Sequence, residues 1–468
     1  MFSEPSQSEL HLKSRKKYTT DSVYDLTRTK SVRDTLIRIE PLCAKIGVTR
    51  ISNITFMDRL NIPNFSAVLP GTEDIFWVYS GKGPTKASAK ASALMEAIER
   101  FSSLSSSYPK TSIQGTYSQL SKSYNILHPD EVVEQVNEEY DDKHSVLDYL
   151  PGFDLLRNET VLVPTELVLH RYHPKCPAMP AFLSSHTNGL ASGNVLEEAI
   201  CHALCEVIER DAVSLAELCA SAIPYNIVLN IIDSLKGQKS GFSISRIPID
   251  DRFVDDSSIF PDVNISEIAD GFMPINALVK RFIRAGISLL IKDITQKDIG
   301  IPSFVASSIE WVTQDYGLFA KGFGTHPDSR IALVRAITEA SQTRAVNIQG
   351  ARDDLRKVQY KIDDEISKRK WPFIPASLSS ATSNNNIRNI IYFSQIKTYF
   401  NEDILDDIHF VLNRLKNAGM KRAIIVDLTN PDIGIPVVRA IVPGLETFEV
   451  QNSIMGRRGR VFWRRHLS

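Results

Sequence analysis

A segment that occurs three times along the chain limits the folds that this sequence can adopt. The copies cover residues 81–100, 191–210 and 322–343. They align on a shared glutamate, which is Glu96, Glu206 and Glu339 in chain order. Each copy has alanine three and seven residues before that glutamate, and the first two copies match at eight of the eighteen positions from Gly83 to Arg100. Internal similarity of this kind indicates one structural unit used repeatedly.

A second repeat surrounds the third copy. Residues 278–302 resemble residues 410–436, and a looser version runs from Asp58 to Pro63. The two longer copies each predict a helix that stops at Ala-Gly, a β-branched strand, and a turn with the sequence Asp-Ile-Gly-Ile-Pro. An apolar run suited to a further strand follows each turn. The sequence therefore predicts an α/β fold of quasi-repeated strand–helix modules, with a closing C-terminal module at 385–450.

The first repeat predicts a helix with one acidic face. On a helical wheel at about 100° per residue, the first copy groups Ser92, Glu96, Glu99 and Arg100. The second copy groups His202, Glu206, Glu209 and Arg210. Such a face on a single helix is usually solvated. Its recurrence, the alanines that share it, and the glycine-bearing turn before each copy favour a face that binds a ligand, with the glycines letting backbone approach that ligand.

The side chains on these faces predict the chemistry of the ligand. Four carboxylates facing one another across a cleft would repel, and divalent cations with oxygen ligands, above all Mg²⁺, relieve that repulsion. The carboxylates proposed as metal ligands are Glu96, Glu99, Glu206 and Glu209, of which Glu99 and Glu209 are also the candidate catalytic residues. The planar guanidinium of arginine matches phosphate oxygens, and this assigns phosphate binding to Arg100, Arg210 and Arg335. Lys82, in Gly-Lys-Gly, is not followed by Ser or Thr and so lies in no Walker A loop.

Composition excludes several classes of protein. The net charge of −1 gives no global attraction to nucleic acid or to an anionic membrane. Five cysteines are too few for a disulfide scaffold, and Cys201 and Cys205 are expected to pack in a core. Without an apolar span or signal peptide, we expect a cytoplasmic protein. Residues 1–40 are expected to form a polar extension, of which residues 1–18 are a disordered lead-in, and residues 451–468 a solvated basic tail.

Three blocks of this sequence resemble the YcaO family. They are GKG with SALMEAIER, SSHTNGLASG with EEAICHALCEVIERDA, and GFGTHPDSRIALVRAITEASQTRA, and the resemblance covers residues 45–450. It implies a YcaO-type α/β fold around a central ATP/Mg site, and an enzyme that uses ATP and Mg²⁺ to phosphorylate a peptide backbone amide oxygen. It also implies ATP-binding roles for Ser92, Arg100, Asn188, Glu198, His202, Arg210 and Arg335. His202 stands where the family commonly has glutamine, so a packing or nucleotide-contacting role is expected for it.

The resemblance leaves the product of the reaction open. The last residues, RRGRVFWRRHLS, lack the proline-rich end common among azoline-forming cyclodehydratases. In this respect the chain resembles archaeal proteins that thioamidate a glycine in the alpha subunit of methyl-coenzyme M reductase. Those proteins often work with a TfuA-type partner and need a sulfide donor. The remaining alternatives are azoline or amidine formation and a non-catalytic ATP-binding accessory protein, and a homo-oligomer is expected in each case.

Overall fold

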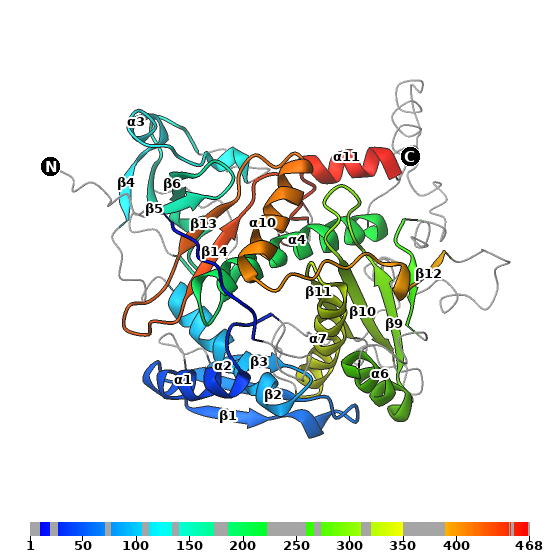
Figure 1. The fold of residues 1–468 in the computed structure, drawn as a ribbon. Helices are drawn as coiled ribbons and strands as arrows, with labels where there is room; N and C mark the ends of the chain where they lie inside the picture. The colour runs from blue at the N-terminus through cyan, green and yellow to red at the C-terminus, as the bar shows by residue number, and fades with distance from the viewer. Residues whose placement is uncertain are drawn as a thin grey trace, which may run out of the picture.

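The computed structural model describes residues 10–18, 27–70, 76–104, 112–132, 140–172, 186–221, 259–265, 273–309, 320–349, 389–448, 450 and 454–466 (Figure 1). The helices in these residues are α1 (Val32–Lys45), α2 (Lys86–Ser103), α3 (Tyr117–Leu120), α4 (Leu196–Ser221), α6 (Met273–Ala285), α7 (Ser329–Gln349), α10 (Ile404–Asn417) and α11 (Arg457–His466). The strands are β1 (Arg50–Asn53), β2 (Asn64–Pro70), β3 (Phe76–Lys82), β4 (Ile113–Thr116), β5 (Val146–Asp154), β6 (Glu159–Pro164), β7 (Leu190–Ser192), β8 (Asp262–Asn264), β9 (Ser288–Asp293), β10 (Ser303–Ile309), β11 (Ala320–Thr325), β12 (Ile390–Tyr392), β13 (Ile424–Asp427) and β14 (Val437–Ile441).

These strands form three sheets, each with an antiparallel three-stranded unit. The units are β1-β2-β3, β9-β10-β11 and β13-β14-β7. The last strand of each unit leads directly into a helix of the first repeat: β3 into α2, β11 into α7, and β7 into α4. The second sheet is extended by β8 and β12, and the third by β4, β5 and β6. The predicted α/β architecture of quasi-equivalent modules is thus confirmed.

The second repeat forms the opening of each unit. α6 ends before Gly286 and α10 before Gly419, and both glycines adopt the left-handed backbone conformation that ends a helix, with φ of +65° and +91°. α1 and β1 begin the first unit in the same way. In the third unit α10, β13 and β14 come from the end of the chain, whereas β7 and α4 come from its middle. The three units are therefore alike in space although their order along the chain differs.

The shared alanines and glycines of the first repeat pack against each other. A Cβ on Gly81 would collide with the backbone of Ala89 and Ala93, and one on Gly324 would collide with the equivalent residues Ala332 and Ala336. These alanines have no exposed surface. The interpretation that they line the ligand-binding face is wrong, because they lie where each helix meets its own strand. Gly81 and Gly324 likewise let a strand approach a helix backbone and not a ligand, whereas Gly83 lines a central cavity.

The two ends of the chain are more ordered than the sequence predicted. Lys17 is 6% exposed and pairs at 2.5 Å with Asp407 of α10. Residues 10–18 therefore do not form the expected disordered extension, because their cations meet buried carboxylates. The predicted boundary between extension and domain, at residues 40–45, crosses α1, which contributes Ile39 and Cys43 to the core.

The basic tail is likewise not fully solvated. Arg458 of α11 donates from Nε to Asp211 at 2.7 Å and from Nη1 to Asp298 at 2.6 Å. Asp211 belongs to α4 and is fully buried. The Gly459 backbone N–H donates to Glu446, so the first turn of α11 is fixed to the body of the protein. The tail thus contacts α4 at Asp211, the residue that follows Arg210.

We predict that Gly81→Ala lowers the free energy of unfolding by about 3 kcal/mol, because the added methyl group meets helix backbone that cannot move aside. Gly286→Ala is the matched control. A Cβ there would contact nothing, so only the left-handed backbone is strained, at a cost of about 1 kcal/mol. Urea denaturation of both variants measures the difference. Equal destabilisation would contradict the close packing of β3 on α2.

Candidate active site

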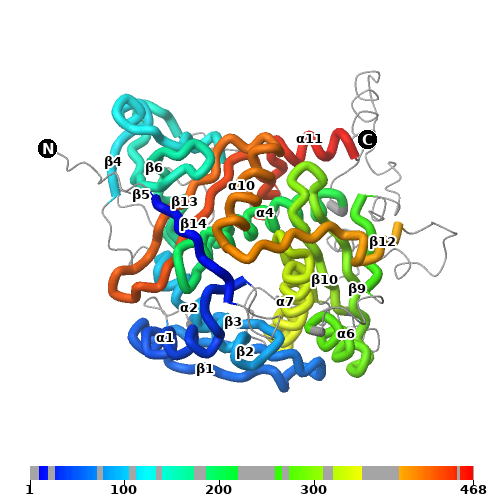
Figure 2. Tube along the Cα trace, in the orientation of Figure 1, coloured from blue at the N-terminus to red at the C-terminus, as the bar shows by residue number. Residues whose placement is uncertain are grey.

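The three helices of the first repeat border one central cavity. Its volume is about 730 Å³. Figure 2 shows that the traces of α2, α4 and α7 come together in the middle of the molecule. Residues of α2, α4 and α7 line it, together with residues 27–35 and 186–194. All but one of the site residues predicted from the sequence lie on its wall: Ser92, Glu96, Glu99, Arg100, Asn188, His202, Glu206, Glu209, Arg210 and Arg335. Side chains from distant parts of the sequence therefore share one site.

Two of the carboxylates in this cavity, those of Glu99 and Glu209, are shielded from solvent. Glu99 is 8% exposed, and burial raises its pKa to about 8, with the Glu206 charge acting in the same direction. Burial, with the neighbouring Glu339, raises the pKa of Glu209 to about 7. Burial also raises the pKa of Glu206. The charged forms of these groups therefore lack the water that would normally stabilise them, and a bound cation would replace it.

Guanidinium groups lie against the same carboxylates. Arg100 Nη2 is 3.5 Å from Glu96 Oε1, and Arg100 Nη1 is 3.8 Å from Glu99 Oε1. Arg210 Nη2 is 3.6 Å from Glu209 Oε1. Arg335, from the third copy, donates to the Thr325 carbonyl at 3.2 Å and is surrounded by so little water that burial lowers its pKa. The cavity therefore presents both acidic and basic groups to a ligand.

The donor groups of the cavity fit a nucleotide with Mg²⁺. Three polar atoms on its wall are buried without a hydrogen-bond partner: Arg100 Nη1, Asn188 Oδ1 and His202 Nδ1. Within the described residues, no three carboxylate, imidazole or thiol groups gather closely enough to hold an ion as they stand. Mg²⁺ usually takes only one or two protein carboxylates and completes its shell with water and phosphate, so the carboxylate-lined wall remains suited to it.

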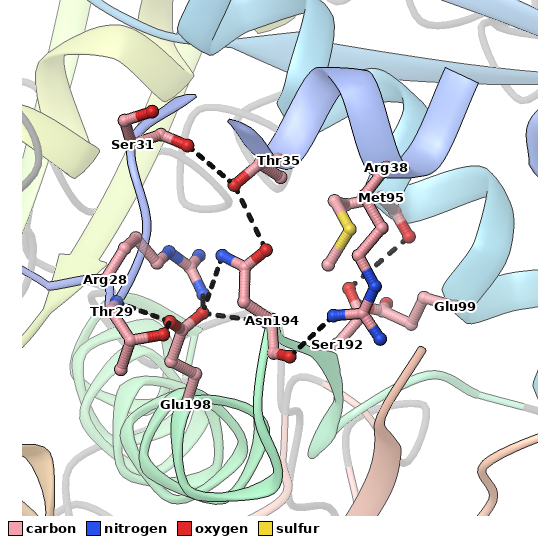
Figure 3. Close-up of polar contacts among 10 residues, drawn as sticks. All are labelled: Arg28, Thr29, Ser31, Thr35, Arg38, Met95, Glu99, Ser192, Asn194 and Glu198. Atoms are coloured by element: carbon pink, nitrogen blue, oxygen red, sulfur yellow. Dashed lines mark hydrogen bonds and ion pairs between the residues drawn. The ribbon is translucent and has the colours of Figure 1, made fainter. Parts of the chain in front are cut away.

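Glu198, the remaining predicted residue, does not line this cavity. Its carboxylate accepts hydrogen bonds from the Thr29 backbone N–H and hydroxyl, both at 2.6 Å, and from the Asn194 backbone N–H at 2.9 Å (Figure 3). Arg28 Nη1 lies 3.4 Å from it. Glu198 therefore holds the segment 27–30 against the start of α4. The structure gives it a positioning contact where the sequence predicted contact with ATP.

This contact places basic residues that the sequence interpretation did not identify. Arg28 and Lys30 line the cavity next to α4. Figure 3 also shows Asn194 bonded to Thr35 of α1, at 3.1 Å between Thr35 Oγ1 and Asn194 Oδ1. Arg28 lies outside the repeats, so the repeat pattern carried no signal for it.

The sequence did not identify two further cations. Lys82 lines the cavity, and Arg439 lies near enough for its charge to oppose the rise in the pKa of Glu206. Lys82 forms an ion pair with Glu339, and this lowers the pKa of that carboxyl group despite its burial. Arg439 on β14 is 3% exposed, and burial lowers its pKa to about 10. It donates to His186 Nδ1 at 2.9 Å. Lys82 stands within the first copy of the repeat, but its sequence context matched no known phosphate loop, whereas Arg439 lies in an ordinary apolar strand.

His202 is half-buried, its Nδ1 is shielded from solvent, and its imidazole is neutral. Burial, with Arg335 and Arg28 nearby, holds its pKa well below the usual range. A neutral imidazole next to arginines can accept or donate one hydrogen bond but adds no charge. The geometry agrees with a nucleotide-contacting residue, and its neighbours Cys201 and Cys205 are buried as expected.

The sequence profile of the YcaO family, described as that of ATP- and Mg²⁺-binding cyclodehydratases, matches residues 80–446. An uncharacterized protein of Methanothermobacter thermautotrophicus is 34% identical over 422 residues, which are 89% of this chain and 94% of that protein. An uncharacterized protein from the tfuA 3′ region of Rhizobium leguminosarum bv. trifolii is 30% identical over 90% of this chain and 88% of its own length. The chain therefore belongs to the YcaO family and is an ATP- and Mg²⁺-dependent enzyme that modifies amides.

Solved structures show the same fold. YcaO from Methanopyrus kandleri bound with AMPPCP and Mg²⁺ has a TM-score of 0.65 at 22% identity, and the match covers 94% of this chain and 98% of that one. A heterocyclase in complex with substrate and cofactor has a TM-score of 0.70 at 22% identity. The match covers 94% of this chain but only 55% of the heterocyclase.

The described part of the chain contains no helix that is both long and apolar enough to cross a bilayer.

We predict that the ligand-free protein loses stability as the pH rises from about 6.5 to about 8.5. The raised pKa values of Glu99 and Glu209 mean that the folded chain still holds protons that the unfolded chain has released, so raising the pH favours unfolding. Glu99→Gln should reduce this dependence, as should added Mg²⁺ with nucleotide. Urea midpoints across this range measure it. The exposed Glu402→Gln is the control, and an equal reduction in that variant would contradict the assignment.

Proposed function

We propose that this enzyme phosphorylates a peptide backbone amide oxygen with ATP and that sulfide then replaces the phosphate, which yields a thioamide. The amide oxygen attacks the γ-phosphorus and ADP leaves. Sulfide adds to the activated carbon, and phosphate departs with the original amide oxygen. Activation is needed because an unmodified amide oxygen is a poor leaving group. The observation that carries this proposal is the meeting of five carboxylates and four arginines in one cavity.

The residues divide into two groups by charge. Mg²⁺ supplies charge neutralisation for the phosphoryl group, and the carboxylates suited to hold it are Glu96, Glu99, Glu206 and Glu209. The arginines suited to hold phosphate oxygens are Arg100, Arg210 and Arg335. Ser92, Asn188 and His202 complete the wall with neutral polar groups that can contact the nucleotide. Glu198 supports the site indirectly, because it fixes the segment that carries Arg28.

The relatives support the proposals that the product is a thioamide and that the enzyme works with a TfuA-type partner. The Rhizobium relative is described by its place in the tfuA 3′ region, which fits a TfuA-type partner that delivers sulfide. The archaeal relative from Methanothermobacter thermautotrophicus aligns over nearly its full length. We therefore propose a protein substrate, the glycine of the methyl-coenzyme M reductase alpha subunit, with sulfide as the nucleophile.

Two other functions remain as alternatives. An azoline-forming cyclodehydratase would use the same activation but would let a substrate side chain attack. The heterocyclase neighbours share the fold that such a reaction needs. A non-catalytic accessory protein would bind ATP in the same cavity without turnover. These alternatives differ in the mass of the product and in phosphate release.

We predict that the enzyme, given ATP, Mg²⁺, sulfide, a TfuA-type partner and a glycine-containing peptide of the reductase alpha subunit, raises the peptide mass by about 16 Da, because sulfur replaces oxygen in a covalent modification. Mass spectrometry of the peptide and a phosphate-release assay measure the product and the turnover. A loss of about 18 Da, the mass of water, would indicate azoline formation. ATP binding with no phosphate release on any such peptide would favour the accessory function.

We also predict that Glu99→Gln and Glu209→Gln each reduce peptide-dependent ATP turnover by about 100-fold or more, because a nearly isosteric amide cannot neutralise a metal ion. The fold should be retained, as circular dichroism would show. Glu40→Gln, on the solvent side of α1 and paired with Lys90, is the matched control and should keep full turnover. Undiminished turnover in both active-site variants would remove them from the metal site.

A further inference from the structure

A second cavity lies apart from the first, between the turn after β1 and helix α6. Its volume is about 730 Å³. The residues that line it are Arg59, Leu60, Asn61, Asn276, Ala277, Lys280, Arg281, Arg284 and Ala285. None of them lines the central cavity. Figure 1 shows α6 beside the end of the β1–β2 hairpin, at the lower right of the molecule.

This cavity carries charge of one sign. Four of its lining residues are cationic, and no lining residue is acidic. We call it the basic groove and define it by Arg59, Lys280, Arg281 and Arg284. The whole chain has a net charge of −1, so the groove is a local concentration of positive charge. Lys280 and Arg284 are exposed, and neither forms an ion pair with another described residue.

The arrangement is unfavourable for the helix on its own. Lys280 and Arg284 are four residues apart on α6, where like charges repel each other. The negative end of the helix dipole offsets this for Arg284, which lies in the last turn. The helix dipole does not explain the presence of Arg59, which lies between β1 and β2 and not on α6. Cations gathered from two elements around one space favour an anionic ligand.

The walls of the groove are fixed before any ligand binds. Next to Arg59, the buried Asp58 accepts two hydrogen bonds from Arg344 of α7, at 2.9 and 3.0 Å. Arg281 Nη1 donates to the Asn61 carbonyl, so the two walls are joined. Leu60 packs in the same core cluster as residues of α6. Little backbone conformational entropy would be lost on binding.

The groove lies within reach of the central cavity. Pro274, in the first turn of α6, lines that cavity. At about 1.5 Å per residue, Lys280 lies about 9 Å and Arg284 about 15 Å further along the helix. An extended polypeptide covers these distances with about three to five residues. A chain that leaves the central cavity at Pro274 can therefore place a segment about three to five residues further on in the groove.

We propose that the basic groove binds an acidic segment of the polypeptide substrate, close in sequence to the amide that is modified. This rests on the proposed function. Arginine forks match carboxylates, and Ala277 and Ala285 provide apolar surface for the chain between them. Single-stranded nucleic acid fits less well, because its binding sites combine cations with aromatic side chains and no lining residue of the groove is aromatic.

The test uses the full-length enzyme and a fluorescein-labelled peptide of alternating Glu and Gly, with a Gln-for-Glu peptide as its neutral counterpart. The charge-reversed enzyme carries Lys280→Glu and Arg284→Glu. The control enzyme carries Lys416→Glu and Lys421→Glu, which make the same charge change at exposed positions near the end of α10. Fluorescence anisotropy at low salt should show that the charge-reversed enzyme binds the acidic peptide about tenfold more weakly than the unaltered enzyme does. The control enzyme should bind it with the affinity of the unaltered enzyme.

The proposal is overturned if the charge-reversed and control enzymes bind the acidic peptide equally well. It is also overturned if the unaltered enzyme binds the neutral peptide as tightly as the acidic peptide, or binds single-stranded DNA more tightly than the acidic peptide. Dissociation of an oligomer by the charge reversal, seen in sedimentation velocity, would make the groove an interface between copies and also overturn it. The affinity for a fluorescent ATP analogue, measured in parallel, should be the same in the charge-reversed and control enzymes. If the charge-reversed enzyme keeps both its nucleotide binding and its affinity for the acidic peptide, the groove proposal alone is disproved. If the enzyme forms no thioamide, the proposed function fails, but the anisotropy result for the groove still holds.

Discussion

The close packing of a glycine-bearing strand on an alanine-bearing helix is the constraint on which the site depends. Where β3 meets α2, and where β11 meets α7, a strand residue without a side chain touches the helix backbone directly. A helix held this closely cannot rotate about its axis, so the direction of its polar face is fixed by the strand beneath it. Ser92, Glu96 and Arg100 reach the central cavity for this reason.

α4 lacks an equally extensive contact with a strand, because β7 covers only Leu190–Ser192. Electrostatic contacts near the start of the helix and just beyond its middle supplement it. Glu198 near its start binds Thr29, and Asp211 beyond its middle binds Arg458. Each carboxylate is buried and bonded, so removal of its partner would leave an unpaired charge in the interior. Segments outside the repeats thereby hold the helix that carries Glu206 and Glu209.

The sequence predicted the modules well because repetition supplies an internal alignment. Agreement among copies identified Glu96 and Glu206, as well as the Ala-Gly helix ends at Gly286 and Gly419. The same reasoning misplaced the shared alanines, because a helical wheel gives angles but does not show which neighbour lies at each angle. It could not find Arg28, whose position depends on a hydrogen bond between Thr29 and Glu198, 169 residues apart. Pairing of this kind leaves no periodic pattern.

Threefold repetition of the backbone does not produce threefold chemistry. In the third copy, Arg335 replaces the position of Ser92 and His202, and Gln342 replaces that of Glu99 and Glu209. Lys82 neutralises the one carboxylate that this copy retains, and Gln342 donates to the Ser80 carbonyl. Two acidic helices thus face a third that is neutral or basic. A nucleotide bound between them would meet the proposed metal-binding carboxylates only on α2 and α4, whereas α7 offers it Arg335. This asymmetry restricts the direction in which its phosphates can lie.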